Sequence, residues 1–378
     1  MIGNLSTALL QQIWWILVSI VGSLFLVLTF VQGGQTLLWQ VARTEAEKQL
    51  VINSLGRKWE LTFTTLVLFG GALFAAYPKF YSTSFGGAYW VWMLILFTFI
   101  VQAVSYEYRA KPNNLLGAGV YEGFLFINGS VGVLLIGTAV GTFFTGSNFT
   151  LNDFNQVTWT HPLRGVEAAF SIFNLSLGMF LVFNARVLGS MYLVNNLDFQ
   201  GFGTFEQRLR KACLMNLVCA LPFLLIVLGS LLTMDGFGFD GVGKVSVVPY
   251  KYLGNLLAMP VVLALLLGGL LLVIWGVALT AWKQRTTGIW FGGLGTVLVG
   301  LAVFFTAGFN NTPFYPSKTD LQSSLSIYNA SSSHITLTAM SYVALIIPLV
   351  LGYIAYVWWR MDARKLSSDE IMADRKSY

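Results

Sequence analysis

Charged residues are the scarcest feature of this 378-residue chain. Asp, Glu, Lys and Arg make up 10% of it, whereas ordinary soluble domains carry about 25%. Hydrophobic residues make up 56%, and the mean hydropathy is +0.70. So few charges leave no basic soluble face of the kind that binds nucleic acid. The composition instead predicts an all-α membrane protein built from hydrophobic helices.

Cysteine and histidine are also rare, with two residues of each. Cys213 and Cys219 lie six residues apart within one hydrophobic run, a pattern that predicts neither a disulfide framework nor a metal site. His161 and His334 fall outside the predicted spans, and nothing in the sequence resembles a paired-histidine haem site. We therefore expect no metal site and no haem ligand in this chain.

Long hydrophobic runs are what the sequence has in quantity. A helix needs about 20 apolar residues to cross the hydrocarbon core of a bilayer, and we count nine candidate runs. They cover residues 9–31, 61–78, 87–108, 119–145, 166–190, 212–233, 256–281, 288–308 and 336–359. The segments between them are too short for a soluble domain. We expect a single polytopic membrane domain over residues 1–378.

The distribution of Lys and Arg predicts the orientation of these spans. If the N-terminus lies outside the cell, 17 of the 22 basic residues fall in cytoplasmic segments. Cytoplasmic loops of membrane proteins carry such an excess. The sequence therefore predicts an external N-terminus and a cytoplasmic C-terminus, and the net charge of +6 is a sign of topology.

A few charged residues lie at the predicted cytoplasmic ends of spans two to five. They are Glu60, Glu107, Glu122 and Arg186. A carboxylate there can stabilise a helix N-terminus or pair with an arginine, or it can collect protons and pass them on. The residues alone leave both roles open. They also leave open a secondary transporter of a small neutral solute, with polar midplane residues such as Asn128 and Asn174 as its binding groups.

Six short motifs occur in an order and spacing typical of one family. They are "IWW" at 13–15, "VINSLGRKWE" at 51–60, "GGALFAAYPKFYSTSFGGAY" at 70–89, "YEYR" at 106–109, "PFYPS" at 313–317 and "SLSIYNASSSHITLTAM" at 324–340. Together they resemble subunit II of the cytochrome bd-type ubiquinol oxidases, from about Trp14 to the C-terminus.

This resemblance implies nine transmembrane helices arranged as two four-helix bundles and one peripheral helix. It implies a haem-free subunit of the bacterial cytoplasmic membrane, paired with a subunit I that carries haem b and haem d. Together the two subunits would oxidise quinol and reduce dioxygen to water with protons from the cytoplasm. The family also allows a structural quinone or lipid in this subunit and a small single-helix accessory subunit beside it.

The resemblance also implies roles for particular residues. The family's tryptophan–acid pair falls on Trp59 and Glu60, and its aromatic–acid–aromatic–arginine motif places an acid at Glu107. With Glu122, these acids are our candidates for a cytoplasmic proton route, supported by Trp59 and Arg186.

The chain departs from the family pattern at three places: residues 29–34, the residues "LTFTT" at 61–65, and Gln102. Gln32 stands where the family has an acid, and Gln102 stands where it has an arginine. We therefore expect either a reduced or rerouted proton path or a different quinone and cofactor environment.

Overall fold

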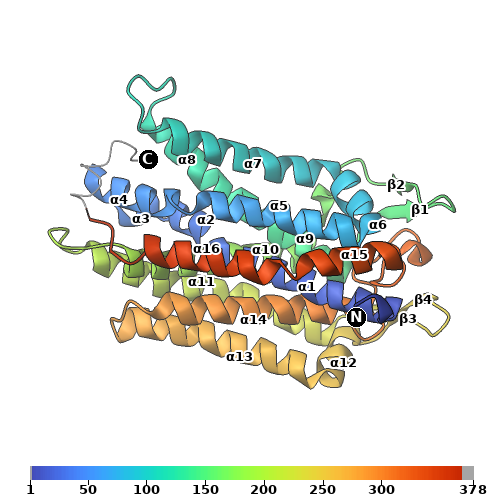
Figure 1. Cartoon of the computed structure of the whole chain (residues 1–378). Coiled ribbons are helices and arrows are strands. Elements are labelled where there is room, and N and C mark those ends of the chain that lie inside the picture. The colour runs from blue at the N-terminus through green and yellow to red at the C-terminus, as the bar shows by residue number, and fades with distance from the viewer. Residues whose placement is uncertain (1, 368–378) are drawn as a thin grey trace.

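The computed structural model describes residues 2–367. Within that part of the chain, nine helices are long and apolar enough to cross a membrane (Figure 1). They are Thr7–Thr36, Glu45–Ala76, Tyr89–Tyr108, Ala118–Thr145, Ile172–Asn196, Phe205–Thr233, Pro260–Trp282, Gly288–Gly308 and His334–Met361. The predicted all-α membrane fold with nine spans is confirmed.

Several spans contain more than one helical segment. The α-helical segments of the first half of the chain are α1 (Thr7–Leu28), α2 (Phe30–Thr36), α3 (Leu38–Val41), α4 (Glu45–Gly56), α5 (Trp59–Ala76), α6 (Pro78–Tyr81), α7 (Tyr89–Tyr108), α8 (Ala118–Ile127) and α9 (Val133–Thr145). The second half has α10 (Ile172–Asn196), α11 (Phe205–Thr233), α12 (Lys251–Ala258), α13 (Pro260–Val277), α14 (Gly288–Gly308), α15 (His334–Ala344) and α16 (Ile347–Met361).

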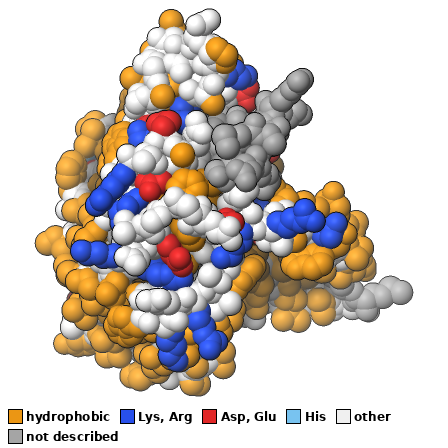
Figure 2. Space-filling view, turned by 90° about the vertical axis from the view of Figure 1, so that its left-hand side faces the viewer, with side chains coloured by type: hydrophobic (Ala, Val, Ile, Leu, Met, Phe, Trp, Pro, Cys, Tyr) orange, Lys and Arg blue, Asp and Glu red, His pale blue; other side chains and the backbone are white. Residues whose placement is uncertain are grey.

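The two ends of the bundle differ in character. One end carries the N-terminus and two short antiparallel hairpins, β1 (Phe149–Leu151) with β2 (Val157–Trp159) and β3 (Gly236–Phe239) with β4 (Val245–Val248). We call it the hairpin end. The other carries α3, α4 and the end of α16, and Figure 2 shows Lys, Arg, Asp and Glu gathered on it. We call it the basic end.

Helix α10 lies at the centre of the bundle. In its span, 78% of the most hydrophobic window is buried, against 11% for α15–α16. Close backbone contact makes this position possible, because a Cβ on Gly33 would lie 1.9 Å from the Ala185 carbonyl oxygen. Likewise, a Cβ on Gly189 would lie 2.3 Å from the Gly34 amide nitrogen. Small residues of this kind let membrane helices pack tightly. The low burial of α15–α16 shows that the ninth span is peripheral.

The second and sixth spans begin earlier than the sequence predicted. We expected helices from residues 61 and 212, but α4 begins at Glu45 and α11 at Phe205. The Thr44 side chain caps α4 and forms a capping box with Glu47. The Glu47 carboxylate also accepts a hydrogen bond of 2.6 Å from Arg208 on α11. Polar residues from distant parts of the chain therefore pair with each other by hydrogen bonds. Hydropathy alone does not reveal such pairs.

The fifth span lies further along the chain than predicted. We expected residues 166–190, but residues Val166–Phe170 form a 3₁₀ turn after Gly165, which has a φ of +100°. The α-helix runs from Ile172 to Asn196. Because the helix ends six residues later than expected, Arg186 is displaced from the end of the span into its interior.

Candidate functional site

The buried carboxylate of Glu122 organises the basic end. Its side chain is 3% exposed. One oxygen, Oε2, accepts hydrogen bonds of 2.9 Å from Trp39 Nε1 and from Lys48 Nζ. The other, Oε1, accepts bonds of 3.2 and 2.8 Å from Arg109, which also pairs with Glu45. Glu122 thus ties α3, α4 and the end of α7 to α8, and its oxygens are occupied.

Glu60 has a different environment. It lies in the first turn of α5, where the helix dipole favours a carboxylate. Its side chain is exposed, and within residues 2–367 it forms no ion pair or hydrogen bond. The neighbouring Trp59 ring stacks on Tyr106 of α7 with 5.9 Å between centroids. Of the three predicted acids, Glu60 is the one whose carboxylate has no partner in the described part of the chain.

Glu107 is exposed at the end of α7 and pairs with Lys111. Lys111 Nζ donates a hydrogen bond to the Glu107 carboxylate, and this bond raises the pKa of Lys111. Glu107 therefore forms a local surface ion pair. The structure gives no hydrogen bond or ion pair that would join Glu60, Glu107 and Glu122 into one chain of acids in the described part of the protein.

Arg186 is not at the cytoplasmic end of its span, so that prediction is wrong. It lies ten residues before the last residue of α10. Its guanidinium donates to Gln40 Oε1 of α3, and its Nε is buried without an acceptor. Among the described residues no carboxylate pairs with it. The contact of Arg186 with the basic end is therefore its hydrogen bond to the Gln40 side-chain amide.

Two of the positions predicted as departures from the family meet in a buried chain of amides between α2, α7 and α8. Gln32 Nε2 donates to Gln102 Oε1 at 3.4 Å, and Gln102 Nε2 donates to Gln35 Oε1 at 3.0 Å. Gln35 Nε2 then donates to Asn128 Oδ1 at 2.7 Å. The Tyr106 hydroxyl also donates to Gln35 Oε1. The sequence analysis missed Gln35 and Tyr106, although the i, i+3 spacing of Gln32 and Gln35 puts both on one helix face.

A second buried ion pair fixes the peripheral helix α16. Lys58 is fully buried just before α5, and its Nζ lies 3.2 Å from Asp362 Oδ1 and 5.0 Å from the Trp358 ring centre. Asp362 also accepts hydrogen bonds from Trp358 Nε1 and Asn196 Nδ2. Lys58 and Asp362 lie far apart in the sequence, so local sequence patterns did not predict this ion pair.

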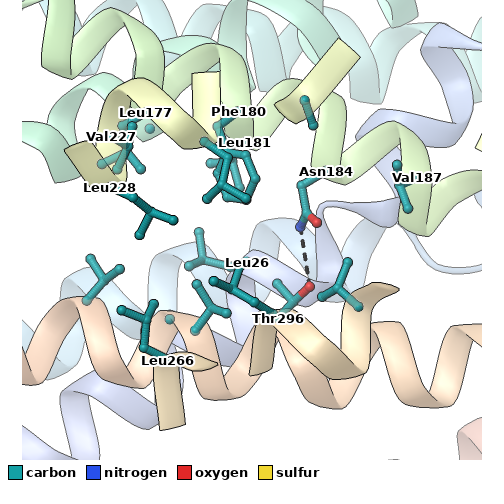
Figure 3. A pocket seen from close by; sticks show the side chains of 18 of the residues that line it. Leu26, Leu177, Phe180, Leu181, Asn184, Val187, Val227, Leu228, Leu266 and Thr296 are labelled. Atoms are coloured by element: carbon teal, nitrogen blue, oxygen red, sulfur yellow. Dashed lines mark hydrogen bonds between the residues drawn. The ribbon is translucent and has the colours of Figure 1, made fainter. Parts of the chain in front are cut away.

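An apolar slot with a cavity volume of about 100 Å³ lies between α10, α11, α13 and α14. Leucine, valine and phenylalanine side chains line it, including Leu181 and Leu228 (Figure 3). Its clearest polar feature is the bond from Asn184 Nδ2 to Thr296 Oγ1, at 3.3 Å. The lining contains no His, Met or Cys, the usual haem ligands. The slot therefore suits an apolar chain.

Comparison with known proteins identifies the family. The sequence model described as "Cytochrome bd terminal oxidase subunit II" matches residues 10–361. The chain belongs to this family. It is 28% identical over 373 residues to "Cytochrome bd-I ubiquinol oxidase subunit 2" of Escherichia coli K12, covering 95% of this chain and 96% of that protein. "Probable cytochrome oxidase subunit 2" of Haemophilus influenzae is 27% identical over 371 residues, with coverage of 94% and 95%.

A solved structure shares the fold of this chain. The chain matches one chain in "The structure of bd oxidase from Geobacillus thermodenitrificans" with a TM-score of 0.64 and 16% sequence identity. The match covers 93% of this chain and 97% of the other. The resemblance drawn from short motifs is confirmed, and a bd oxidase subunit II implies a complex with a subunit I.

Proposed function

We propose that this chain is the haem-free subunit of a bacterial quinol oxidase. It supports a haem-bearing subunit I, which oxidises quinol and reduces dioxygen to water. The family match over residues 10–361 carries this proposal. The two histidines agree with a haem-free role, because His334 Nε2 contacts the Leu5 carbonyl oxygen and His161 Nδ1 lies 3.5 Å from Glu167.

The gathering of Lys and Arg on one end supports the proposed orientation in the cytoplasmic membrane. We place the basic end in the cytoplasm and the hairpin end, with the N-terminus, outside. In this orientation Glu60, Glu107 and Glu122 face the compartment that supplies protons to the oxidase.

The environments of the acids favour Glu60 as the proton-collecting group. Its carboxylate is exposed and unpaired among the described residues, whereas Glu122 is held by three side chains and Glu107 by Lys111. We assign Glu122 and Arg109 to the structure of the basic end. Trp59 and Tyr106 connect the start of α5 to the amide chain that begins at Gln32.

A solute transporter fits the structure less well. Asn174 Oδ1 accepts a hydrogen bond from Thr145, and its Nδ2 donates to the Ala168 carbonyl. Asn128 is bonded to Gln35 and Thr98. The amides expected to bind a neutral solute are thus used within the protein.

Dependence on the partner tests the proposed role. Expressed without subunit I, this chain should aggregate or be degraded, because part of its apolar surface would lack its protein partner. Expressed together, the two chains should purify as a coloured complex that consumes oxygen when quinol is added. A solitary chain that remains monodisperse and colourless in mild detergent, with full stability, would argue for a transporter.

We propose the slot of Figure 3 as the place of a structural lipid or quinone tail. It runs beside α11 from Leu217 to Leu231, which is about 21 Å at 1.5 Å per residue. This length suits one acyl or isoprenoid chain. The proposal is supported by the apolar lining and by the position of the slot among transmembrane helices.

Filling the slot should displace such a tail. Ala220 lines it and is 3% exposed, so Ala220→Phe puts a ring into the space. Val218→Phe is the control, since Val218 is 57% exposed on the same helix. We expect mass spectrometry of the purified complex to show one bound lipid or quinone fewer in the first variant alone. Equal lipid and quinone content in both variants would argue that the slot holds no tail.

A further inference from the structure

Two buried polar atoms near the start of α5 have no hydrogen-bond partner within residues 2–367. Trp59 Nε1 is a donor and Gln32 Oε1 is an acceptor, and both are inaccessible to solvent. Gln32 is 0% exposed as a whole residue. Buried polar groups are normally paired with protein or with ordered water. An unused donor and an unused acceptor in one region indicate a shared ligand.

The packing of α5 against α1 and α2 puts Trp59 and Gln32 at similar levels along the bundle. Thr62 Oγ1 donates to the Leu28 carbonyl oxygen at 3.1 Å, which fixes the register of the two spans. Consecutive spans run in opposite directions. Both residues therefore lie on the basic-end side of the Thr62–Leu28 hydrogen bond. Trp59, three residues before Thr62, is about 4.5 Å from its level, and Gln32, four residues after Leu28, is about 6 Å from it.

Helix α7 provides the third wall between these residues. The Trp59 ring stacks on Tyr106, and Gln32 donates to Gln102. Tyr106 and Gln102 are four residues apart, so they share one face of α7. Trp59 and Gln32 thus approach that face from two neighbouring helices.

We propose that Trp59 and Gln32 bind one water molecule between them, between α2, α5 and α7. The water accepts from the indole N–H and donates to the amide oxygen. A metal cation would need several oxygen ligands, and an anion would leave the Gln32 oxygen without a donor. Water supplies both functions, and buried waters typically bind polar groups left unpaired by the protein.

The role of this water depends on the proposed proton route. The binding of the water itself depends only on the two unpaired atoms. The water extends the hydrogen-bonded chain of Asn128, Gln35, Gln102 and Gln32 as far as Trp59, the residue next to Glu60. Trp59 is then a positioning residue, which orders the water through its N–H.

The direct test is a map of the complete oxidase at a resolution that shows ordered water. We expect one isolated peak within hydrogen-bonding distance of Trp59 Nε1 and Gln32 Oε1, which disappears in Trp59→Phe. Phenylalanine keeps an aromatic ring at the Tyr106 contact and removes the N–H donor together with the five-membered ring that carries it. The absence of a peak in the unmodified complex would overturn the proposal, and so would density continuous with a larger molecule, such as a lipid or quinone hydroxyl.

Thermal unfolding of the complex provides a second measure. We expect Trp59→Phe and Gln32→Met each to lower the melting temperature by about 1–3 °C. The double variant should lose less than the sum of the two single losses, because each change alone releases the same water. Trp90→Phe, at an exposed indole of α7, is the control. Fully additive losses would contradict a shared water. If the peak is present but Glu60→Gln leaves turnover unchanged, the route fails and the water site stands.

Discussion

Glu122→Gln should lower the stability of the complex far more than the same change at Glu107. The Glu122 side chain is 3% exposed and receives bonds from Arg109, Lys48 and Trp39. The loss of the Glu122 charge leaves Arg109, itself 4% exposed, with the exposed Glu45 as its one charged partner among residues 2–367. Removing one partner of a buried ion pair costs about 3 kcal/mol or more, because the remaining charge is uncompensated. Thermal unfolding of the purified complex measures the loss.

Glu107→Gln is the matched control, because it removes a carboxylate from an exposed ion pair at the same end of the molecule. Solvent screens such pairs, and their contribution is small. The double variant Glu122→Gln with Arg109→Gln should recover part of the loss, since the arginine charge is then absent as well. Equal melting temperatures for Glu122→Gln and Glu107→Gln would show that Glu122 does not anchor the basic end.

Asp362→Asn should release the end of α16 from the bundle. No residue of α16 is buried, so the helix depends on contacts near its ends. At the basic end these are the pair of Asp362 with the fully buried Lys58 and the adjoining bonds to Trp358 and Asn196. We expect the amides of Ile347–Met361 to exchange hydrogen faster, with a loss of about 3 kcal/mol in the stability of this contact.

Two variants separate the ion pair from other effects of the substitution. Asp198→Asn removes a carboxylate at the same end that, among the described residues, accepts one local bond from the Gln200 amide. It should leave exchange in α16 unchanged. The double variant Lys58→Met with Asp362→Leu replaces both charges by apolar groups, which is often neutral in a buried site. Protection of α16 in Asp362→Asn equal to that of the unmodified protein would contradict its anchoring role.

The sequence allowed the spans, their order and the family to be predicted, because hydrophobic runs and short motifs are local features. The bounds of spans two, five and six required tertiary information. Glu47 and Arg208 belong to different spans. Each charge compensates the other, so both polar segments can form helix. Arg186 lies in the interior of its span because α10 ends at Asn196, six residues later than the sequence predicted.

The candidate site was predicted only in part. Glu60, Glu107 and Glu122 are found near one end of the bundle, as expected, but they occupy three separate environments. Gln32 and Gln102 were identified as positions without charge, yet their contact depends on the packing of α2 against α7. The unpaired atoms of Trp59 and Gln32 have no signature in the sequence at all.

The proposal that this haem-free chain collects protons for its partner depends most on Glu60. We would purify the complex with Glu60→Gln and record its visible haem spectrum and its quinol-driven oxygen uptake across pH, with Glu107→Gln as the control. The account predicts several-fold slower uptake in Glu60→Gln alone, with an unchanged haem spectrum. Uptake equal to that of the unmodified complex at every pH would contradict it, and so would a loss of the haem spectrum, which would make Glu60 a structural residue.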